Sequence, residues 1–362
     1  MGFSCGIIGL PNSGKSTIFN ALTALSVAAQ PYPFCTIEPN LGIVPVPDGR
    51  LTALARIMKP EKVTPTTIEF IDIAGLVKDA HKGEGLGNRF LGQIREVDAI
   101  AHVVRCFEGN NIPHVYATID AGRDIETIET EIIISDLEIV EERLNKIERL
   151  AKVSKEKHGE EQEVLVKIRK ALEAGRFVNM DDLNAEERET VKSFSLIATK
   201  PVFYIANIDE GDLENLPLEE IEKAAAEKGR KVVYICGKLE EELALLPAEE
   251  RAGFMEMYGM KEIGIEKIIR VGYDVLDLIT FYTVVGREMR AWTVRKNTPV
   301  VKAAGKIHSD MERGFIRAEV MSCEDFIRLG SEHAVREKGL IKIEGKEYLV
   351  QDGDILHIRF NV

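Results

Sequence analysis

The stretch GLPNSGKST, residues 9–17, begins in the apolar run SCGIIGL and ends in KSTIFNALTAL, a segment with helical composition. It matches the phosphate-binding pattern GxxxxGK(S/T) through Gly9, Gly14, Lys15 and Ser16. A strand before the loop and a helix after it suit this chemistry, because the glycines turn backbone N–H groups toward phosphate oxygens and the helix N-terminus adds positive potential. The stretch therefore predicts a P-loop in a nucleotide-binding domain.

The side chains of this loop have distinct expected tasks. We expect Lys15 to reach the β- and γ-phosphates, which makes it a catalytic residue, and Ser16 to ligate Mg²⁺. Asn12 raises the possibility of a K⁺ ion, which an asparagine at this position binds in some switch NTPases; the alternative is a plain turn residue. The residues of the loop expected to contact the nucleotide are Asn12, Ser13, Gly14, Lys15, Ser16 and Thr17.

Further apolar runs predict a parallel sheet. Segments 66–75, 97–107, 200–209 and 231–237 are strand-like, and helical segments alternate with them. This alternation is typical of βαβ units, and a continuous apolar run such as AIAHVV indicates a strand covered on both faces. The predicted fold class is α/β, a P-loop NTPase with a parallel sheet and flanking helices.

Two changes in the residue pattern divide the chain into domains. Between residues 128 and 151 apolar residues recur at steps of four and three, which is heptad spacing, and a second helical segment follows Gly159. This pattern predicts an inserted antiparallel helical coiled coil. From residue 278 the chain is β-rich with the turn signals EGK and QDGD, which predicts a small β-grasp-like domain. The predicted domains are the nucleotide-binding segments 1–127 and 200–277, the insertion 128–199 and the C-terminal domain 278–362.

Composition limits the classes of partner. The 362 residues carry a net charge of −13, which argues against naked nucleic acid as a partner of the whole chain. No apolar run approaches the roughly 18–20 residues of a membrane span, so no membrane partner is expected. The cysteines are odd in number, far apart and never in a CxxC pair, which favours reduced thiols and a cytoplasmic location. They are Cys5, Cys35, Cys106, Cys236 and Cys323.

A metal site is predicted from residues beyond the loop. FIDIAG places the pattern DxxG, Asp72 and Gly75, at the end of a strand. There the Asp72 carboxylate can hold Mg²⁺ through water, and the Gly75 N–H can sense the γ-phosphate. Thr36, in the Pro-rich stretch PYPFCTIEPN, is a candidate to complete the metal shell, as a loop threonine does in switch NTPases. The predicted metal ligands are therefore Ser16, Thr36 and Asp72.

Base recognition is expected at a later strand end. Guanine-specific switches carry Asn-Lys-x-Asp there, whereas this chain has Asn207, Ile208 and Glu210 at the corresponding positions. The longer, displaced carboxylate no longer suits guanine, and adenine does not need it, so the sequence favours ATP, with GTP binding more weakly. Asp209 is the alternative to Glu210, and Ile208 either packs on the purine or fills the core.

The quoted motifs resemble those of a known family. GLPNSGKST, PFCTIEPN, DIAGLVKDAHKGEGLGNRFL and NIDE, in this order, look like the YchF branch of the Obg-like P-loop proteins. The resemblance spans the chain and implies a nucleotide domain, an inserted coiled coil and a C-terminal TGS-like β-grasp domain. It also implies a preference for ATP, association with the ribosome through the large subunit or the 70S particle, and a role in translation or stress responses.

The residue that orients the attacking water is the least defined part of the site. Leu76 follows DxxG where Ras-like switches have Gln, so slow intrinsic hydrolysis is expected. His114, in the loop EGNNIPHVYAT, is the candidate catalytic residue because an imidazole can position water near neutral pH. The alternatives are that His114 is a surface loop residue, or that His102 or His81 acts instead.

The C-terminal domain offers a second candidate surface. Residues 286–306 contain six Lys or Arg, one acidic residue, Glu288, and the single tryptophan, Trp292. Such a surface suits contact with ribosomal RNA, and the alternative is a strand pair with solvated charges and a core tryptophan. Two other functions stay open: a GTPase of the Obg type, or a nucleotide-gated ribosome- or RNA-binding module with little turnover.

Overall fold

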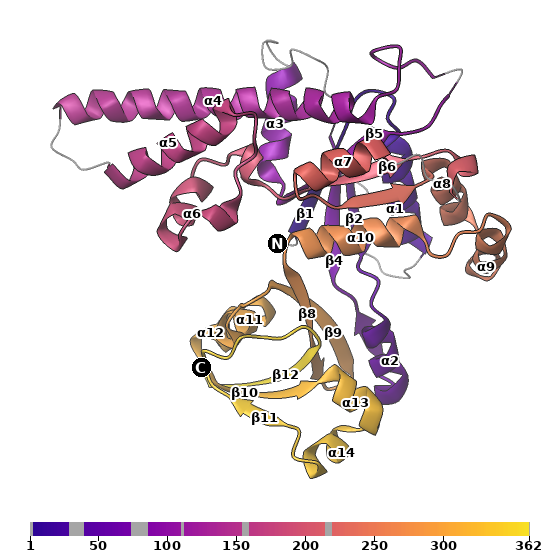
Figure 1. Ribbon diagram of the computed structural model, residues 1–362. Coiled ribbons are helices and arrows are strands. Elements are labelled where there is room, and N and C mark those ends of the chain that lie inside the picture. Colours follow the sequence, from indigo (N-terminus) through magenta and orange to yellow (C-terminus); the bar gives the residue numbers. More distant parts are fainter. Residues whose placement is uncertain are drawn as a thin grey trace. The chain divides into compact units, whose positions relative to one another are not determined.

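The computed structural model describes residues 3–28, 40–73, 86–109, 112–153, 159–213 and 219–361 (Figure 1). The chain folds into two compact units. The P-loop unit contains Phe3–Gly42 and Phe70–Ile268, and the C-terminal unit contains Ile43–Glu69 and Ile269–Val362. Among the described residues, none of the helices combines the length and the apolar character needed to cross a bilayer.

The first sheet confirms the predicted α/β class. Its strand order is β2-β4-β1-β5-β6-β7, and β1, β5, β6 and β7 pair in parallel. Every residue of β5 and β6 is buried, as expected for central parallel strands covered on both faces. The strands are β1 (Phe3–Ile8), β2 (Leu41–Pro45), β4 (Thr67–Asp72), β5 (Ala99–Arg105), β6 (Val202–Asn207) and β7 (Val232–Ile235).

Helices lie between these strands or follow them along the chain (Figure 1). They are α1 (Lys15–Ala28), α3 (Leu86–Glu96), α7 (Glu219–Glu227), α8 (Gly237–Leu245), α9 (Ala248–Met257) and α10 (Gly264–Val275). Short 3₁₀ helices are η2 (Met180–Asp182), η3 (Ile197–Thr199) and η4 (Glu210–Asp212). The described cysteines, Cys5, Cys106, Cys236 and Cys323, are free thiols, and Cys35 lies outside the described residues.

The inserted helices are α4 (Ala121–Val153), α5 (Gly159–Glu173) and α6 (Ala185–Lys192). Figure 1 shows α5 beside the long α4, and the heptad positions Ile133, Val140 and Ile147 are buried. The predicted start of the insertion at residue 128 falls inside α4, which begins at residue 121. Its first turns bury Ile125 and Ile128 in the same apolar core as the strands, so the helix continues without a break from the sheet into the insertion.

The C-terminal unit is a second, mixed sheet with the strand order β11-β10-β12-β8-β9-β3. β8 and β9 form a hairpin, and β8 pairs in parallel with β12. Its strands are β3 (Lys62–Thr64), β8 (Leu278–Val285), β9 (Glu288–Arg295), β10 (Phe315–Ser322), β11 (Lys342–Glu344) and β12 (Asp354–Phe360). Its helices are α2 (Gly49–Met58), α11 (Val300–Ile307), α12 (Ser309–Arg313), α13 (Cys323–Leu329) and α14 (Glu332–Glu337).

The C-terminal unit differs from the predicted domain 278–362 because it also takes in residues 43–69 and 269–277, which the prediction assigned to the nucleotide-binding domain. The added strand β3 pairs in parallel with β9. On the added helix α2, Leu51 and Leu54 are buried against Tyr282 and Met289 of the sheet. The burial of these leucines, about 1.5–3 kcal/mol for each side chain, holds the segment on the second sheet.

Candidate nucleotide-binding site

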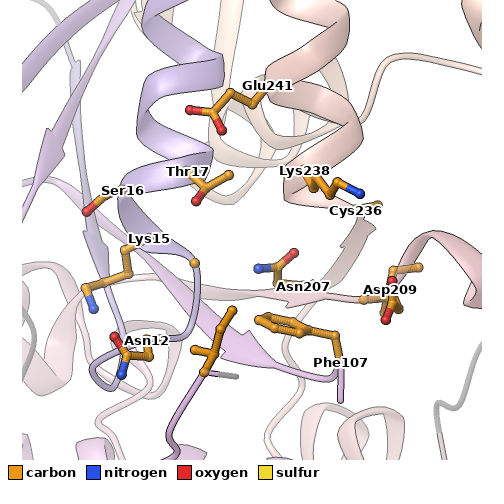
Figure 2. A pocket seen from close by; sticks show the side chains of 13 residues that line it. Asn12, Lys15, Ser16, Thr17, Phe107, Asn207, Asp209, Cys236, Lys238 and Glu241 are labelled. Carbon is orange, nitrogen blue, oxygen red and sulfur yellow. The ribbon is translucent and has the colours of Figure 1, made fainter. Parts of the chain in front are cut away.

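A cavity of about 500 Å³ lies where β5, β6 and β7 end and α1 begins (Figure 2). The carboxyl edge of a parallel sheet is the usual ligand site in such folds, and this volume is within the range of small-molecule sites. The residues that line the cavity are Asn12, Gly14, Lys15, Ser16, Thr17, Phe107, Ile112, Asn207, Ile208, Asp209, Cys236, Lys238 and Glu241.

The P-loop turns sharply before α1. Asn12 has a φ of 63° and Gly14 a φ of 95°, both in the left-handed region. The Ser13 N–H donates to the Leu10 carbonyl at 3.3 Å, and the Ser13 hydroxyl is buried without a partner among the described residues. A buried hydroxyl without a partner costs free energy, so this atom is consistent with a cradle built for a polar ligand.

Lys15 is folded against its own loop. Its ammonium donates to the Leu10 carbonyl at 2.9 Å, and the residue is only 8 % exposed. Burial lowers the pKa of Lys15, and the negative charge of Asp72 opposes that shift. The side chain is therefore a desolvated cation beside a carboxylate, an arrangement in which a polyphosphate would gain strong electrostatic stabilisation.

Asp72 and Ser16 fit a magnesium ion. The Ser16 hydroxyl donates to Asp72 Oδ2 at 3.4 Å, and Asp72 Oδ1 is buried without a partner among the described residues. Burial raises the pKa of Asp72, and Lys15 and Ser16 oppose that rise. Mg²⁺ commonly binds to one or two carboxylates together with phosphate oxygens, so the orphaned oxygen suits this ion. Thr36, the third predicted ligand, lies outside the described residues, as does Gly75.

Asn207 ties two loops together. Its Nδ2 donates to the Ser13 carbonyl at 3.0 Å, and its Oδ1 accepts from the Gly237 N–H at 3.0 Å. The residue is 5 % exposed, so its amide is engaged within the protein. Although Asn207 lines the cavity, these contacts position the P-loop against the start of α8 rather than present the amide to a base.

Two acidic residues follow Ile208, and they lie differently with respect to the cavity. Among the described residues, Asp209 lines the cavity and Glu210 does not. Glu210 forms an exposed ion pair with Lys238 at 3.4 Å, and its N–H donates to Asp209 Oδ1 at 2.8 Å as η4 begins. Asp209, the alternative one residue earlier, is thus the carboxylate that lines the cavity, and a role of Glu210 in base recognition stays a prediction. Ile208 lines the cavity and is almost completely buried.

Phe107 is a cavity residue that the sequence analysis missed. It follows β5 after Cys106, and Figure 2 shows its ring below Asn207 and between Asn12 and Asp209. Lys238 and Glu241 of α8 were also missed. The available signal was the position of an aromatic residue just beyond the carboxyl end of a buried strand, where ligand-facing residues gather.

His114 lies in a loop that contacts the P-loop. Asn12 Nδ2 donates to the Pro113 carbonyl at 3.0 Å. His114 Nε2 is 2.8 Å from Asp124 Oδ2, Nδ1 accepts from the Tyr116 N–H at 3.2 Å, and the side chain is 5 % exposed. His114 is not among the described residues that line the cavity, and it is not a surface side chain either.

The sequence also offered His102 and His81 as alternatives to His114. His102 is 1 % exposed on β5 and packs edge-on against Tyr204, and burial lowers the pKa of His102 to about 4. His102 is therefore neutral near pH 7 and is not among the described residues that line the cavity. His81, like Leu76, lies outside the described residues.

Comparisons with known proteins agree with this architecture. Residues 4–136 match the family described as "50S ribosome-binding GTPase", and residues 278–361 match the YchF-GTPase C-terminal family, described as "Protein of unknown function (DUF933)". The chain is 50% identical over 363 residues to the "Ribosome-binding ATPase YchF" of Haemophilus influenzae and 45% identical over 366 residues to that of Bacillus subtilis, with 100% of each chain covered. The solved structure of the Schizosaccharomyces pombe YchF GTPase superposes with a TM-score of 0.88 at 36% identity, covering 99% of this chain and 97% of that one.

Proposed function

This chain belongs to the YchF family of P-loop proteins, and from that premise we propose that it is a cytoplasmic, ATP-binding and ATP-hydrolysing switch that associates with the ribosome. The observation that carries the proposal is the cavity itself. Its lining combines the buried Lys15 and Ser16, whose hydroxyl donates to Asp72, with a base wall that lacks the Asn-Lys-x-Asp set of guanine-specific switches.

The base wall supports ATP over GTP. Guanine binding in switch proteins needs a carboxylate free to accept from two base N–H groups at once. Here one oxygen of Asp209 already accepts from the Glu210 N–H, and the Glu210 carboxylate pairs with Lys238. Phe107 and Ile208 offer apolar surface to any purine. The wall therefore favours stacking over hydrogen-bonded guanine selection.

The chain's own residues have separate parts in hydrolysis. Lys15 stabilises negative charge on the β- and γ-phosphates, and Ser16 and Asp72 would hold the magnesium ion. When bound, that ion neutralises phosphate charge during the transfer. The P-loop backbone, fixed by Asn207, orients the triphosphate.

Calorimetric titration with non-hydrolysable ATP and GTP analogues in Mg²⁺ tests the base preference. We expect the ATP analogue to bind at least about tenfold more tightly, a difference of ~1.4 kcal/mol. Equal or tighter binding of the GTP analogue would instead favour a GTPase of the Obg type.

Turnover with and without ribosomes tests the switch. We expect slow intrinsic ATP hydrolysis that rises when ribosomes are added. Ribosome binding that depends on the bound nucleotide, with negligible turnover in both conditions, would favour the nucleotide-gated binding module.

We propose that His114 is the residue that positions the attacking water. The Asn12–Pro113 contact keeps its loop beside the P-loop. Both ring nitrogens are engaged, Nε2 with Asp124 and Nδ1 with the Tyr116 N–H, so the proposed role requires His114 to exchange one of these partners for the water. His114→Ala should lower turnover by about 10²-fold or more while nucleotide affinity stays within twofold, since positioned acid–base groups contribute on that scale. Asp124→Asn keeps a hydrogen-bonding partner for the ring, so its turnover should fall less than that of His114→Ala. Unchanged turnover in His114→Ala with intact binding would remove His114 from the mechanism.

A potassium ion near Asn12 is the second mechanistic proposal. Asn12 lines the cavity, and its amide nitrogen faces away to Pro113. The amide oxygen is the atom that would ligate the cation. Replacing K⁺ by Na⁺ should slow turnover by about tenfold, a change of ~1.4 kcal/mol in the barrier. Equal rates in the two buffers would make Asn12 a turn residue only.

The ribosome contact is proposed on the C-terminal unit. Exposed Arg290 lies with Cζ 4.1 Å from the centre of the Trp292 ring, while Trp292 itself is half-buried and donates to Thr283 Oγ1 at 2.8 Å. Ion pairs with Glu61 and Glu312 occupy two of the basic residues predicted for this surface, Arg287 and Lys302. Arg290 is the cation that lies over the tryptophan, and it is the one that we propose meets ribosomal RNA of the large subunit or the 70S particle.

Co-sedimentation with ribosomes tests this surface. Arg290→Glu should weaken binding about tenfold or more and reduce its salt dependence, because a phosphate contact releases counterions. Arg313→Glu, the same charge change on α12 of the same unit, is the matched control and should leave binding unchanged. Equal effects of the two variants would place the contact elsewhere.

A further inference from the structure

Arg105, the last residue of β5, is a buried cation that the proposed chemistry does not use. It is 2 % exposed. Its Nε donates to the Phe107 carbonyl at 3.3 Å and its Nη2 to the Ile112 carbonyl at 3.1 Å. Among the described residues its Nη1 has no hydrogen-bond partner. Burial lowers the pKa of Arg105, and the negative charge of Asp124 opposes that shift. The hydrogen bonds of the guanidinium nevertheless go to two neutral carbonyls, and burying it there costs stability, so packing alone does not explain this arginine.

The residues that Arg105 holds are both walls of the cavity. Phe107 and Ile112 line it, whereas Arg105 is not among the described residues that do. The guanidinium lies against the Phe107 ring, with Cζ 4.5 Å from the ring centre. Because Arg105 is outside the cavity lining and stacks on one face of the ring, the opposite face is the one left for a ligand.

Gly109, two residues after Phe107, lies close to this guanidinium. A Cβ added at Gly109 would lie 3.1 Å from Arg105 Nη2 and 3.4 Å from the Phe107 ring. Arg105 is also in register with Asn207 on the neighbouring strand β6. The final residues of two adjacent strands thus anchor the loops around the cavity, Asn207 the P-loop and Arg105 the loop that carries Phe107.

We propose that Arg105 is a positioning residue for the purine: it supports Phe107 from behind, so that base, phenyl ring and guanidinium form a three-layer stack. This inference rests on the proposed function, since it requires a purine nucleotide in the cavity. Every base has a π-face, so stacking on the Phe107 ring, with the guanidinium attracted to the other side of that ring, does not depend on which base is bound. The stack therefore selects for a flat base without choosing between adenine and guanine. It adds affinity to the base wall and leaves ATP preference to Asp209 and its neighbours.

A double-mutant cycle with two ligands tests the proposal. The variants are Arg105→Met, Phe107→Ala and both together, and the ligands are a non-hydrolysable ATP analogue and inorganic tripolyphosphate, each with Mg²⁺. Arg105→Met should weaken the ATP analogue about tenfold and leave tripolyphosphate within twofold. In the Phe107→Ala background, Arg105→Met should lower the affinity for the ATP analogue less than twofold, because a residue that acts through Phe107 has nothing left to support.

Controls separate this result from loss of folding. Arg143→Met removes another arginine that lies over an aromatic ring, Phe194, in the helical insertion, and it should leave ATP affinity unchanged. Arg105→Lys keeps the charge and lacks the planar fork, so it should lose ATP affinity in the same direction, and it provides the cycle if the methionine variant does not fold.

Two results would overturn the inference. One is an equal loss for tripolyphosphate and the ATP analogue, which would make Arg105 a phosphate or folding residue. The other is full additivity of the two substitutions. A wild-type protein that binds tripolyphosphate but neither ATP nor GTP analogue would instead refute the proposed function, so the two failures are distinguishable.

Discussion

Gly14→Ala is expected to abolish nucleotide binding, with affinity for an ATP analogue falling by about 10²-fold or more. Gly14 has a φ of 95°, where an L-residue is strained, and a Cβ there would lie 2.1 Å from Asn207 Nδ2. Asn207 cannot retreat cheaply, because its amide joins the Ser13 carbonyl to the Gly237 N–H. The added methyl group therefore displaces the loop that carries Lys15 and Ser16.

Gly253→Ala is the matched control for this substitution. Gly253 lies inside α9, no atom lies within 4 Å of its added Cβ, and its φ is not in the left-handed region. Alanine there should leave binding unchanged and stabilise the helix by about 0.5–1 kcal/mol. Calorimetry and thermal unfolding measure both effects. Wild-type affinity in Gly14→Ala would show that the P-loop does not bind phosphates in this conformation.

Arg230→Met is expected to have the largest effect on stability. Arg230 forms an ion pair with Glu129, its Nη1 lies 2.7 Å from the Tyr204 hydroxyl, and it packs on the Phe177 ring with Cζ 4.4 Å from the centre. Glu129 is 4 % exposed, so removing the arginine leaves a buried carboxylate short of a partner. Breaking a buried pair on one side costs about 3–5 kcal/mol, measured as the free energy of unfolding in urea.

The double variant Arg230→Met with Glu129→Met discriminates the cause. Replacing both charges with apolar side chains removes the buried carboxylate that has lost its arginine and keeps only Lys228 and Tyr204, so most of the lost stability should return. Lys228→Met is a milder control, since Lys228 contacts Glu129 at 2.8 Å from a more exposed position. A cost below about 1 kcal/mol for Arg230→Met would mean that water reaches Glu129 freely.

The same network predicts a pH dependence. Burial acts to raise the pKa of Glu129, but the charge of Arg230 and hydrogen bonds from Lys228 and Tyr204 outweigh it, so the pKa is lowered. A carboxylate with a lowered pKa stabilises the fold above its unfolded pKa, about 4.3, and this contribution is lost as pH falls through the folded value. Removing Arg230 takes away its charge, which is one cause of the lowered pKa, so the pKa of Glu129 is higher in Arg230→Met than in the wild type. The stability gap between wild type and variant should therefore narrow as the pH falls toward about 4, close to the unfolded pKa.

Much of the fold follows from patterns that are local in the chain. The P-loop could be predicted because Gly14, Lys15 and Ser16 are neighbours and their geometry is set within one turn. The coiled coil could be predicted because heptad spacing places Ile133, Val140 and Ile147 on one face of a single helix. The boundary predicted at residue 128 falls inside α4, since a helix pattern does not reveal where its buried face changes partner.

The base wall shows where local patterns fail. Asp209 and Glu210 are consecutive residues after the end of β6, so the motif alone does not say which of them lines the cavity. The turn at η4 decides it. Phe107 belongs to no motif, and an aromatic residue after an apolar run resembles any core residue, so the sequence did not reveal it as a cavity residue. Segment 43–69 lies in the P-loop part of the sequence but packs on the C-terminal sheet through Leu51 and Leu54.

The amino-acid sequence by itself determined the phosphate cradle, the parallel sheet that carries it and the helical insertion, because each depends on residues a few positions apart. Only the tertiary structure decided how Asn207 and Arg105 anchor the loops around the cavity, and how Arg230 neutralises Glu129. Asn207 reaches Ser13 across 194 residues, and Arg230 reaches Glu129 across 101. Such contacts depend on strand order and loop paths, which no local spacing encodes.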